Sequence, residues 1–186
     1  MVQNPNYMFD KLIEVVVTFI HDILPFKIVD QWEQGVHLSF GKFKKVVYPG
    51  LNFKLPFFDK IWVTPVITQT VNLKPQTVTS LDEKSVVLSS IVRYHIYDVE
   101  KFLLGVMHAN DVLVDTTQGI IRDMVEGTTW EDLVDLTSIV TPEVNNQVGR
   151  WGIRVELISF PDLGEITTYR IISDGKEVVT PISPQI

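Results

Sequence analysis

The side chains that could do chemistry are spread along the chain without the spacing that catalysis or metal binding requires. The 186 residues include four histidines and no cysteine, so disulfides, thiolate metal sites and cysteine nucleophiles are excluded. The histidines are His21, His37, His95 and His108, which fall in four different predicted elements and lack metal-ligand spacing. We therefore expect no metal site and no cofactor.

The acids, serines and glycines do not indicate catalysis either. Acid pairs such as Glu131/Asp132 and Asp115/Asp123 are typical of a solvated helix face rather than of general acid–base work. No nucleophile elbow surrounds the serines of the central region, which are Ser80, Ser85, Ser89 and Ser90. Because the glycines occur singly at turns, no phosphate-cradling loop is predicted. We expect no catalytic residue and no enzymatic activity.

A different chemistry is indicated by the segment from Asp30 to Trp62, where aromatic side chains are interleaved with lysines. The aromatics are Phe40, Phe43, Tyr48, Phe53, Phe57 and Phe58, and the lysines are Lys42, Lys44, Lys45, Lys54 and Lys60. Rings partition into lipid and ammonium groups attract lipid phosphates, so this composition suits an anionic membrane surface. A β-hairpin with a buried aromatic face and solvated lysines fits the same pattern. Both interpretations stay open at this point.

Charge is divided unevenly along the chain. The net charge of −7 argues against general nucleic-acid binding, which needs a basic domain. Six lysines stand against three acids from Lys27 to Lys60, whereas ten acids stand against Lys101 and Arg122 from Asp98 to Glu143. This polarity would hold the first part against an anionic bilayer and turn the second part away from it.

The N-terminal segment Met8 to Leu24 has the apolar spacing of an amphipathic helix that ends before Pro25. Three placements are open: in the membrane interface, against protein, or across the bilayer. The interfacial placement is favoured because a spanning helix would bury Asp10, Glu14 and Asp22, at roughly 2.5–3.5 kcal/mol per charged residue. The apolar residues expected to meet lipid here are Phe9, Leu12, Phe19 and Ile20.

The remaining chain predicts strands first and helices later. Short strands are expected from Phe26 to Val78, among them Thr64–Leu73, followed by a central strand at Val86–Ile96. Two helices are expected first, at Val99–Val106 with Asp98 as N-cap and at Ala109–Val125. A third is expected at Trp130–Leu136, which a capping box from Thr128 to Glu131 would start. A fourth would begin at Thr141 and Pro142 and run to about Arg150. Arg122 and Glu126 are expected to form an i, i+4 pair, with a packed polar contact in an interface as the alternative.

The last part of the chain is expected to return to β-structure. The predicted elements are a strand at Ile153–Phe160, a stop at Pro161–Gly164, and a hairpin in which Tyr169–Ile172 and Glu177–Thr180 flank an Asp174-Gly175 turn.

Several of these segments together resemble the SPFH or band 7 family, which includes stomatin, prohibitin and flotillin. The matching residues are Glu33-Gln34-Gly35-Val36, Phe40-Gly41-Lys42, Tyr48-Pro49-Gly50-Leu51, Lys54–Asp59, Ser80-Leu81-Asp82 with serine for the family's threonine, Glu83–Leu88, Gln118, Ile121 and Arg122 before Glu126-Gly127-Thr128, and Trp151–Val155. The resemblance extends over roughly residues 30 to 160. Two features depart from the family pattern: a clear transmembrane anchor and a C-terminal coiled coil are both missing.

The resemblance implies an α+β fold of the SPFH type, with a β-rich subdomain (26–78) followed by an αβ subdomain (79–164). The residue patterns themselves add an N-terminal amphipathic helix (1–25) and a C-terminal tail with a hairpin (165–186). The resemblance also implies a non-catalytic membrane scaffold that associates side by side into a ring or arc, organises membrane proteins or lipids, and restrains a membrane protease or another membrane protein. Because the segment before residue 25 departs from the family's clear anchor, we expect the attachment to be peripheral. The membrane side is left open. Basic Lys42–Lys60 of one copy could meet acidic Asp98–Glu143 of the next.

The predicted lipid-binding residues of the β-rich part are Tyr48, Phe53, Phe57, Phe58, Lys42, Lys44, Lys45 and Lys54. The alternative function is a soluble protein-binding subunit of a larger complex, viral or envelope-associated. In that case the N-terminal helix would dock on protein and the tail hairpin would add a strand to a partner.

Overall fold

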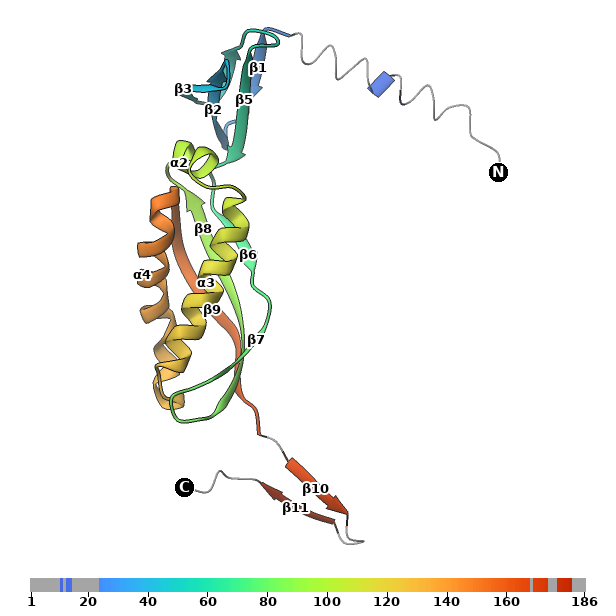
Figure 1. The fold of residues 1–186 in the computed structure, drawn as a ribbon, viewed down its shortest axis with the longest axis vertical. Helices are drawn as coiled ribbons and strands as arrows, with labels where there is room; N and C mark the ends of the chain where they lie inside the picture. Colours follow the sequence, from blue (N-terminus) through green and yellow to red (C-terminus); the bar gives the residue numbers. More distant parts are fainter. Residues whose placement is uncertain (1–10, 12, 15–23, 168, 174–176, 182–186) are drawn as a thin grey trace, which may run out of the picture. The chain divides into compact units, whose positions relative to one another are not determined.

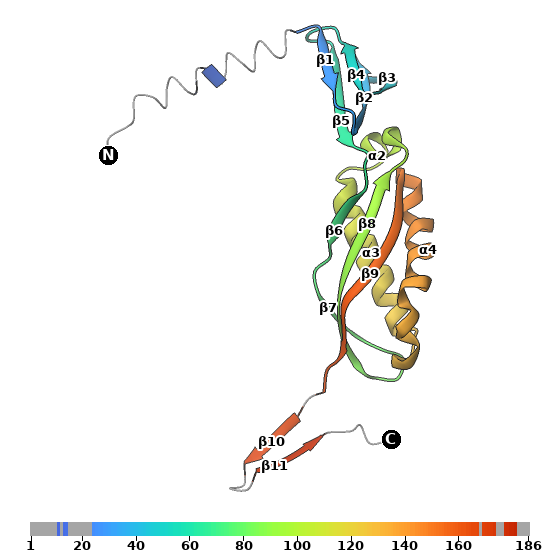
Figure 2. The same cartoon turned by 180° about the vertical axis from the view of Figure 1, so that it is seen from behind.

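The computed structural model describes residues 11, 13, 14, 24–167, 169–173 and 177–181. Its contacts divide the chain into two compact units (Figures 1 and 2). Unit 1 comprises residues 1–67 and 96–109, and unit 2 comprises residues 68–95 and 110–186. This division differs from the predicted boundary at residue 78, because the strands just before that boundary pair within unit 2.

Unit 1 contains two small antiparallel sheets and one short helix. One sheet has the order β3 (Lys42–Val47), β2 (Glu33–Ser39), β5 (Asp59–Pro65), and in the other β1 (Phe26–Val29) pairs with β4 (Gly50–Phe53). Strands from both sheets contribute to one small core, formed by Val29, Val47 and Ile61 with Val63 packed against it.

Helix α2 (Val99–Leu104) contacts β2 and begins where the sequence predicts. The carboxylate of Asp98 accepts a hydrogen bond of 3.1 Å from the backbone N–H of Lys101, which confirms the predicted N-cap.

Unit 2 is built around the long strand β8 (Ser85–Ile96), which confirms the predicted central strand. It pairs with β6 (Gln69–Asn72), β7 (Gln76–Thr79) and β9 (Ile153–Glu165). Helices α3 (Ala109–Glu126) and α4 (Leu136–Val148) cover the same face of this sheet (Figures 1 and 2). Alternate residues of β8 such as Val86, Leu88 and Val92 are fully buried, as a period of two requires for a half-covered sheet.

The tail forms the predicted hairpin. Strand β10 (Tyr169–Ser173) pairs antiparallel with β11 (Glu177–Pro181), from Ser173 opposite Glu177 to Tyr169 opposite Pro181. The predicted turn residues between the strands lie outside the described residues.

Three predicted boundaries are wrong, and each involves proline. Pro142 does not open a helix but lies inside α4, six residues after its start. Pro161 does not stop regular structure, because β9 continues through it to Glu165. The predicted strand Thr64–Leu73 is two strands: β5 ends at Pro65, and β6 begins only after the chain has passed from unit 1 to unit 2.

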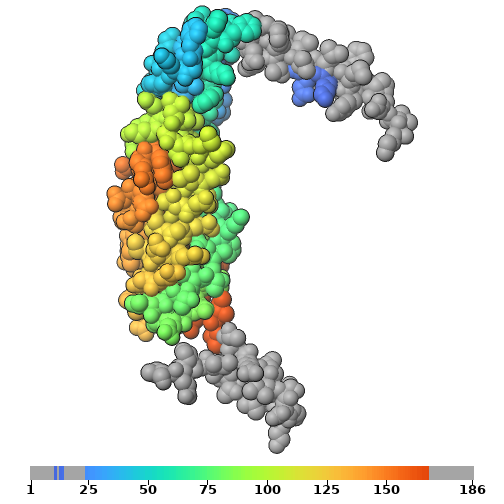
Figure 3. All heavy atoms as spheres, in the orientation of Figure 1, coloured from blue at the N-terminus to red at the C-terminus, as the bar shows by residue number. Residues whose placement is uncertain are grey.

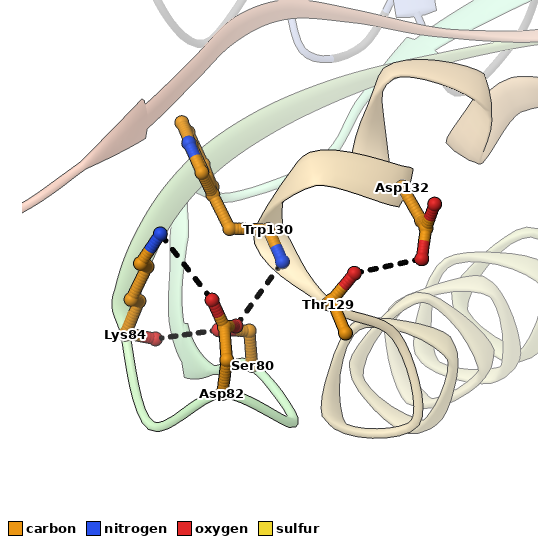
Figure 4. Close-up of polar contacts among 6 residues, drawn as sticks. All are labelled: Ser80, Asp82, Lys84, Thr129, Trp130 and Asp132. Carbon is orange, nitrogen blue, oxygen red and sulfur yellow. Dashed lines mark hydrogen bonds and ion pairs between the residues drawn. The ribbon is translucent and has the colours of Figure 1, made fainter.

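A polar turn between β7 and β8 fixes the start of the short 3₁₀ helix η1 (Trp130–Asp135) (Figure 4). The hydroxyl of Ser80 donates to Asp82 Oδ1 at 2.6 Å, and Lys84 Nζ lies 3.3 Å from Asp82 Oδ2. The backbone N–H of Trp130 donates to Asp82 Oδ1 at 3.1 Å. The Ser80 hydrogen bond is the main cause that lowers the pKa of Asp82, so this carboxylate is charged when it caps η1.

The predicted capping box at Thr128 to Glu131 is therefore wrong. Thr129 is the N-cap residue, but its hydroxyl donates to the Asp132 carboxylate at 2.7 Å instead of accepting from the backbone (Figure 4). The orphan N–H at the start of η1 is satisfied from a turn almost fifty residues earlier in the chain, a partner that local sequence cannot reveal.

Candidate functional site

The turn between β2 and β3 and the loop between β4 and β5 meet at one end of unit 1. The backbone N–H of Phe40 donates to the carbonyl of Phe58 at 3.0 Å, and their rings stack with centroids 4.9 Å apart. Phe40 is 70% exposed and Phe57 80% exposed. We call Phe40, Leu55, Phe57 and Phe58 the aromatic tip. Since the tip is exposed, the alternative interpretation of a buried aromatic face is wrong for Phe40, Phe57 and Phe58.

Two phenylalanines of the aromatic tip adopt backbone conformations that bulky residues rarely adopt. Phe40 has φ 50° and Phe57 has φ 69°, both in the left-handed region. Phe40 and Gly41 (φ 77°) are the two central residues of a hairpin turn, where an Asn-Gly pair would be less strained. Strain of this kind persists only where the surrounding structure holds it, and it marks candidate functional loops.

The surrounding structure includes a buried polar pair directly beneath the tip. His37 Nε2 lies 2.8 Å from Asp59 Oδ2, and both side chains are almost fully buried. The same Asp59 oxygen accepts from the backbone N–H of Leu55 at 3.0 Å, and the backbone N–H of Asp59 donates to the Leu55 carbonyl at 3.0 Å. Asp59 thus closes the loop that carries Phe57.

Hydrogen bonds to Asp59 also keep it ionised. The backbone N–H of Leu55, then the hydroxyl of Ser39 and the ring of His37, hold the pKa of this carboxyl well below its ordinary value of 3.8. Asp59 is therefore a carboxylate throughout the physiological pH range, and its charge contributes to the position of the loop.

A second exposed apolar surface lies on the ribbon of β1 and β4. Ile28 is opposite Leu51 in the register, and both are exposed, as is Phe53 two residues further along β4. Their neighbour Val29 on the opposite face is buried in the small core. Sequence reasoning proposed Phe53 but missed the aliphatic residues Ile28, Leu51 and Leu55. The period-two alternation of β1 and β4 is the signal that could have found the first two.

The structure brings some of the predicted lipid-binding residues together and separates others. Phe57, Phe58 and Lys54 lie in the tip loop, and Lys42 follows the Phe40-Gly41 turn directly. The exposed Lys44 and Lys45 continue along β3. Tyr48 is exposed but lies at the other end of β3, away from the tip turn. The predicted residues Phe9, Leu12, Phe19 and Ile20 lie outside the described residues.

The N-terminal helix as a whole stays a prediction, since only Lys11, Ile13, Glu14 and Leu24 of Met8–Leu24 are described. Within the described part of the chain, no helix is long and apolar enough to cross a membrane. Among the same residues, no group of histidines and acids is arranged to hold a metal ion.

A comparison with protein families identifies the family of the chain. The model of the SPFH domain / Band 7 family matches residues 27–170. This chain belongs to that family, which confirms the resemblance read from the sequence motifs.

Three of the relatives come from two bacteria and an archaeon. Protein HflK of Haemophilus influenzae is 30% identical over 166 residues, which cover 87% of this chain and 39% of that protein. Uncharacterized protein MJ0827 of Methanocaldococcus jannaschii is 22% identical over 86% of this chain and 82% of its own length. The modulator of FtsH protease HflK of Escherichia coli is 33% identical over 54% of this chain and 24% of its own length. The chain thus spans less than half the length of these HflK proteins.

Proposed function

We propose that this chain is a non-catalytic, peripheral membrane scaffold whose unit 1 binds an anionic lipid surface through the aromatic tip. The observation that carries the proposal is the exposure of Phe40, Phe57 and Phe58 beside Lys42 and Lys54. Exposed aromatics in strained, internally braced turns have no role in the chain's own core. They gain free energy when they enter the interfacial region of a bilayer.

The expected free energy of attraction between the lysines and an anionic leaflet supports reversible binding but not permanent anchoring. Basic residues near an anionic leaflet contribute about 1 kcal/mol each. Lys42, Lys44, Lys45 and Lys54 would therefore supply up to about 4 kcal/mol, to which partly inserted rings add. The predicted N-terminal amphipathic helix would be the second attachment, with Phe9, Leu12, Phe19 and Ile20 on its apolar side.

The proposed scaffold associates with copies of itself side by side, in a ring or an arc, and organises membrane proteins or lipids. Family membership supports this part, and the Escherichia coli relative is named for modulating a protease, FtsH. A membrane protease or another membrane protein is accordingly the proposed partner class.

Flotation with anionic liposomes tests the proposal. The intact chain is compared with a variant lacking residues 1–24 and with the double variant Phe57→Ser/Phe58→Ser; Leu157→Ser, at an exposed residue of unit 2, is the control. We expect the tip variant to lose most flotation and the control to keep it. An intact chain that does not float would refute the membrane role and favour the protein-binding subunit. Loss only on truncation would assign binding to the N-terminal helix instead of the tip.

A further inference from the structure

A hollow on the surface of unit 2 lies between α3 and the start of β7. It is lined by Gln76, Gln118, Gly119 and Arg122 and has a volume of about 290 Å³. Figure 3 shows the outer surface of α3 in yellow, with the green segment that contains β6 and β7 beside it. The aromatic tip belongs to unit 1, so this hollow is a separate feature.

Gly119 is not explained by the packing of the chain itself. It lies in the interior of α3, an 18-residue helix, where glycine is among the least favourable residues. A Cβ at this position would meet no atom within 4 Å, and the backbone has ordinary helical conformation. The chain's own packing therefore does not require glycine here, and the missing side chain leaves room for an external group to come close to the helix.

Among the described residues, the hydrogen-bond donors around Gly119 are only partly satisfied. Arg122 is exposed and forms no ion pair with any described residue, so the predicted pair with Glu126 is wrong. The amide Nε2 of Gln76 is buried and has no acceptor within the described part of the chain. Gln118 Nε2 donates to the Lys74 carbonyl at 3.2 Å, which leaves its second N–H free to donate elsewhere.

A carboxylate would satisfy the donors that are reached from outside. The planar guanidinium of Arg122 matches a carboxylate with two parallel hydrogen bonds, and the second N–H of the Gln118 amide can add a third. This is a small cationic site in a chain whose net charge is −7.

We propose that the hollow binds an aspartate or glutamate side chain of a second copy of this chain. Charge complementarity favours that occupant, because the helical part of a second copy presents exposed acids in quantity. These include Asp111, Asp115, Asp123, Glu126, Glu131 and Asp135. The inference rests on the self-association proposed above and assigns one of its contacts to Arg122.

Sedimentation velocity of the full chain, in solution and on small anionic vesicles, is the first test. Arg122→Glu should weaken association at least tenfold. The association of Arg122→Lys should be intermediate between that of Arg122→Glu and that of the unchanged chain, because an ammonium group lacks the planar fork that forms two parallel hydrogen bonds with a carboxylate. Arg93→Glu, an exposed arginine on β8 outside the hollow, makes the same charge change and should alter association less than twofold. Unchanged association in Arg122→Glu would overturn the inference.

Gly119→Ala separates an external contact from an internal structural role. The alanine should raise the thermal midpoint of the chain, since it favours the helix and meets no atom, yet weaken association severalfold by obstructing the approach. A variant that is more stable and associates normally would contradict the proposed contact.

Carbodiimide coupling identifies the partner group. In Arg122→Lys the new amine should form an amide bond with an acid of another copy, which mass spectrometry of mixed isotope-labelled and unlabelled chains would locate. Coupling only within one chain would refute a second copy as the occupant. Binding of free succinate to a monomeric chain, with no association, would show a site for a small anion instead.

Flotation measured on the same variants keeps the two proposals distinguishable. Loss of lipid binding with intact association would affect only the role of unit 1. A chain that stays monomeric in solution and on vesicles would refute both self-association and the Arg122 contact.

Discussion

At the level of single residues, unit 1 uses a buried charge to hold exposed rings. Phe40 and Phe57 have positive φ, and each such bulky residue costs on the order of 1–2 kcal/mol. The Asp59 carboxylate opposes that cost, because it holds the Leu55 N–H and the His37 ring at the base of the same loop. The exposed aromatic surface therefore depends on a residue that is itself buried.

Asp59→Asn should destabilise the chain in a pH-dependent way. The folded-state pKa of Asp59 lies below the ordinary value of 3.8, so ionisation stabilises the folded chain above about pH 4. This contribution is lost as pH falls from there toward the folded-state pKa, because the unfolded chain takes up the proton first. Urea unfolding followed by tryptophan fluorescence should show a deficit for the variant at pH 7 that shrinks at pH 3.

The control for this experiment is Asp30→Asn, at an exposed aspartate in the same unit. It should leave stability nearly unchanged at both pH values. An Asp59→Asn deficit of equal size at pH 7 and pH 3 would mean that the carboxylate charge does not contribute and that only the side-chain shape matters.

At the level of elements, the outer edge of β9 is protected by a side chain from α4. The amide of Asn145 donates to the Val155 carbonyl and accepts from the Val155 N–H, both at 2.8 Å. These two hydrogen bonds replace those of a neighbouring strand, since β9 pairs only with β8 among the described strands. Such protection discourages unwanted strand addition at that point.

Asn145→Ala should lower the free energy of unfolding by about 1–3 kcal/mol, because it leaves two backbone groups of a buried residue unsatisfied. The neighbouring Asn146 is exposed and offers a matched control, for which Asn146→Ala should change stability by less than about 0.5 kcal/mol. Equal effects of the two substitutions in urea unfolding would contradict the role of Asn145.

The same elements explain which parts of the fold the sequence can predict. The β-branched run Val86–Ile96 and the capped start of α2 at Asp98 were predicted well, because their signals are local. Pro142 and Pro161 were misread because a proline ring says nothing about tertiary context. A helix that packs on a sheet can contain a proline, as α4 does, and an edge strand such as β9 does not need every backbone N–H for pairing with a neighbouring strand.

The candidate site was only partly predictable for a related reason. Alternating aromatic and lysine residues in Asp30–Trp62 fit a buried or an exposed aromatic face equally well. The choice depends on Asp59 and His37, which lie on β5 and β2 and meet only after the strands have paired. Arg122 and Gln76 likewise come from different elements, so their hollow could not be inferred from spacing.

At the level of the whole molecule, a net charge of −7 would repel an anionic bilayer if charge were evenly spread. The proposed membrane binding would therefore depend on the local excess of lysine in unit 1, and a salt dependence would follow from that. The Debye length falls from about 10 Å at 0.1 M salt to about 3 Å at 1 M, so lysine–phosphate attraction weakens strongly while the burial of aromatic rings does not.

Substitution of Lys42, Lys44 and Lys45 by glutamine should accordingly cost about 3 kcal/mol of vesicle binding at low salt, roughly a hundredfold in affinity. At 1 M salt the variant and the unchanged chain should converge on the weaker binding that the aromatic tip supports. Lys84→Gln in unit 2 removes a lysine paired with Asp82 and should have no effect on flotation. If the triple variant bound as tightly as the unchanged chain at 0.1 M salt, attachment would have to come from apolar groups alone, and the division of charge along the chain would need another explanation.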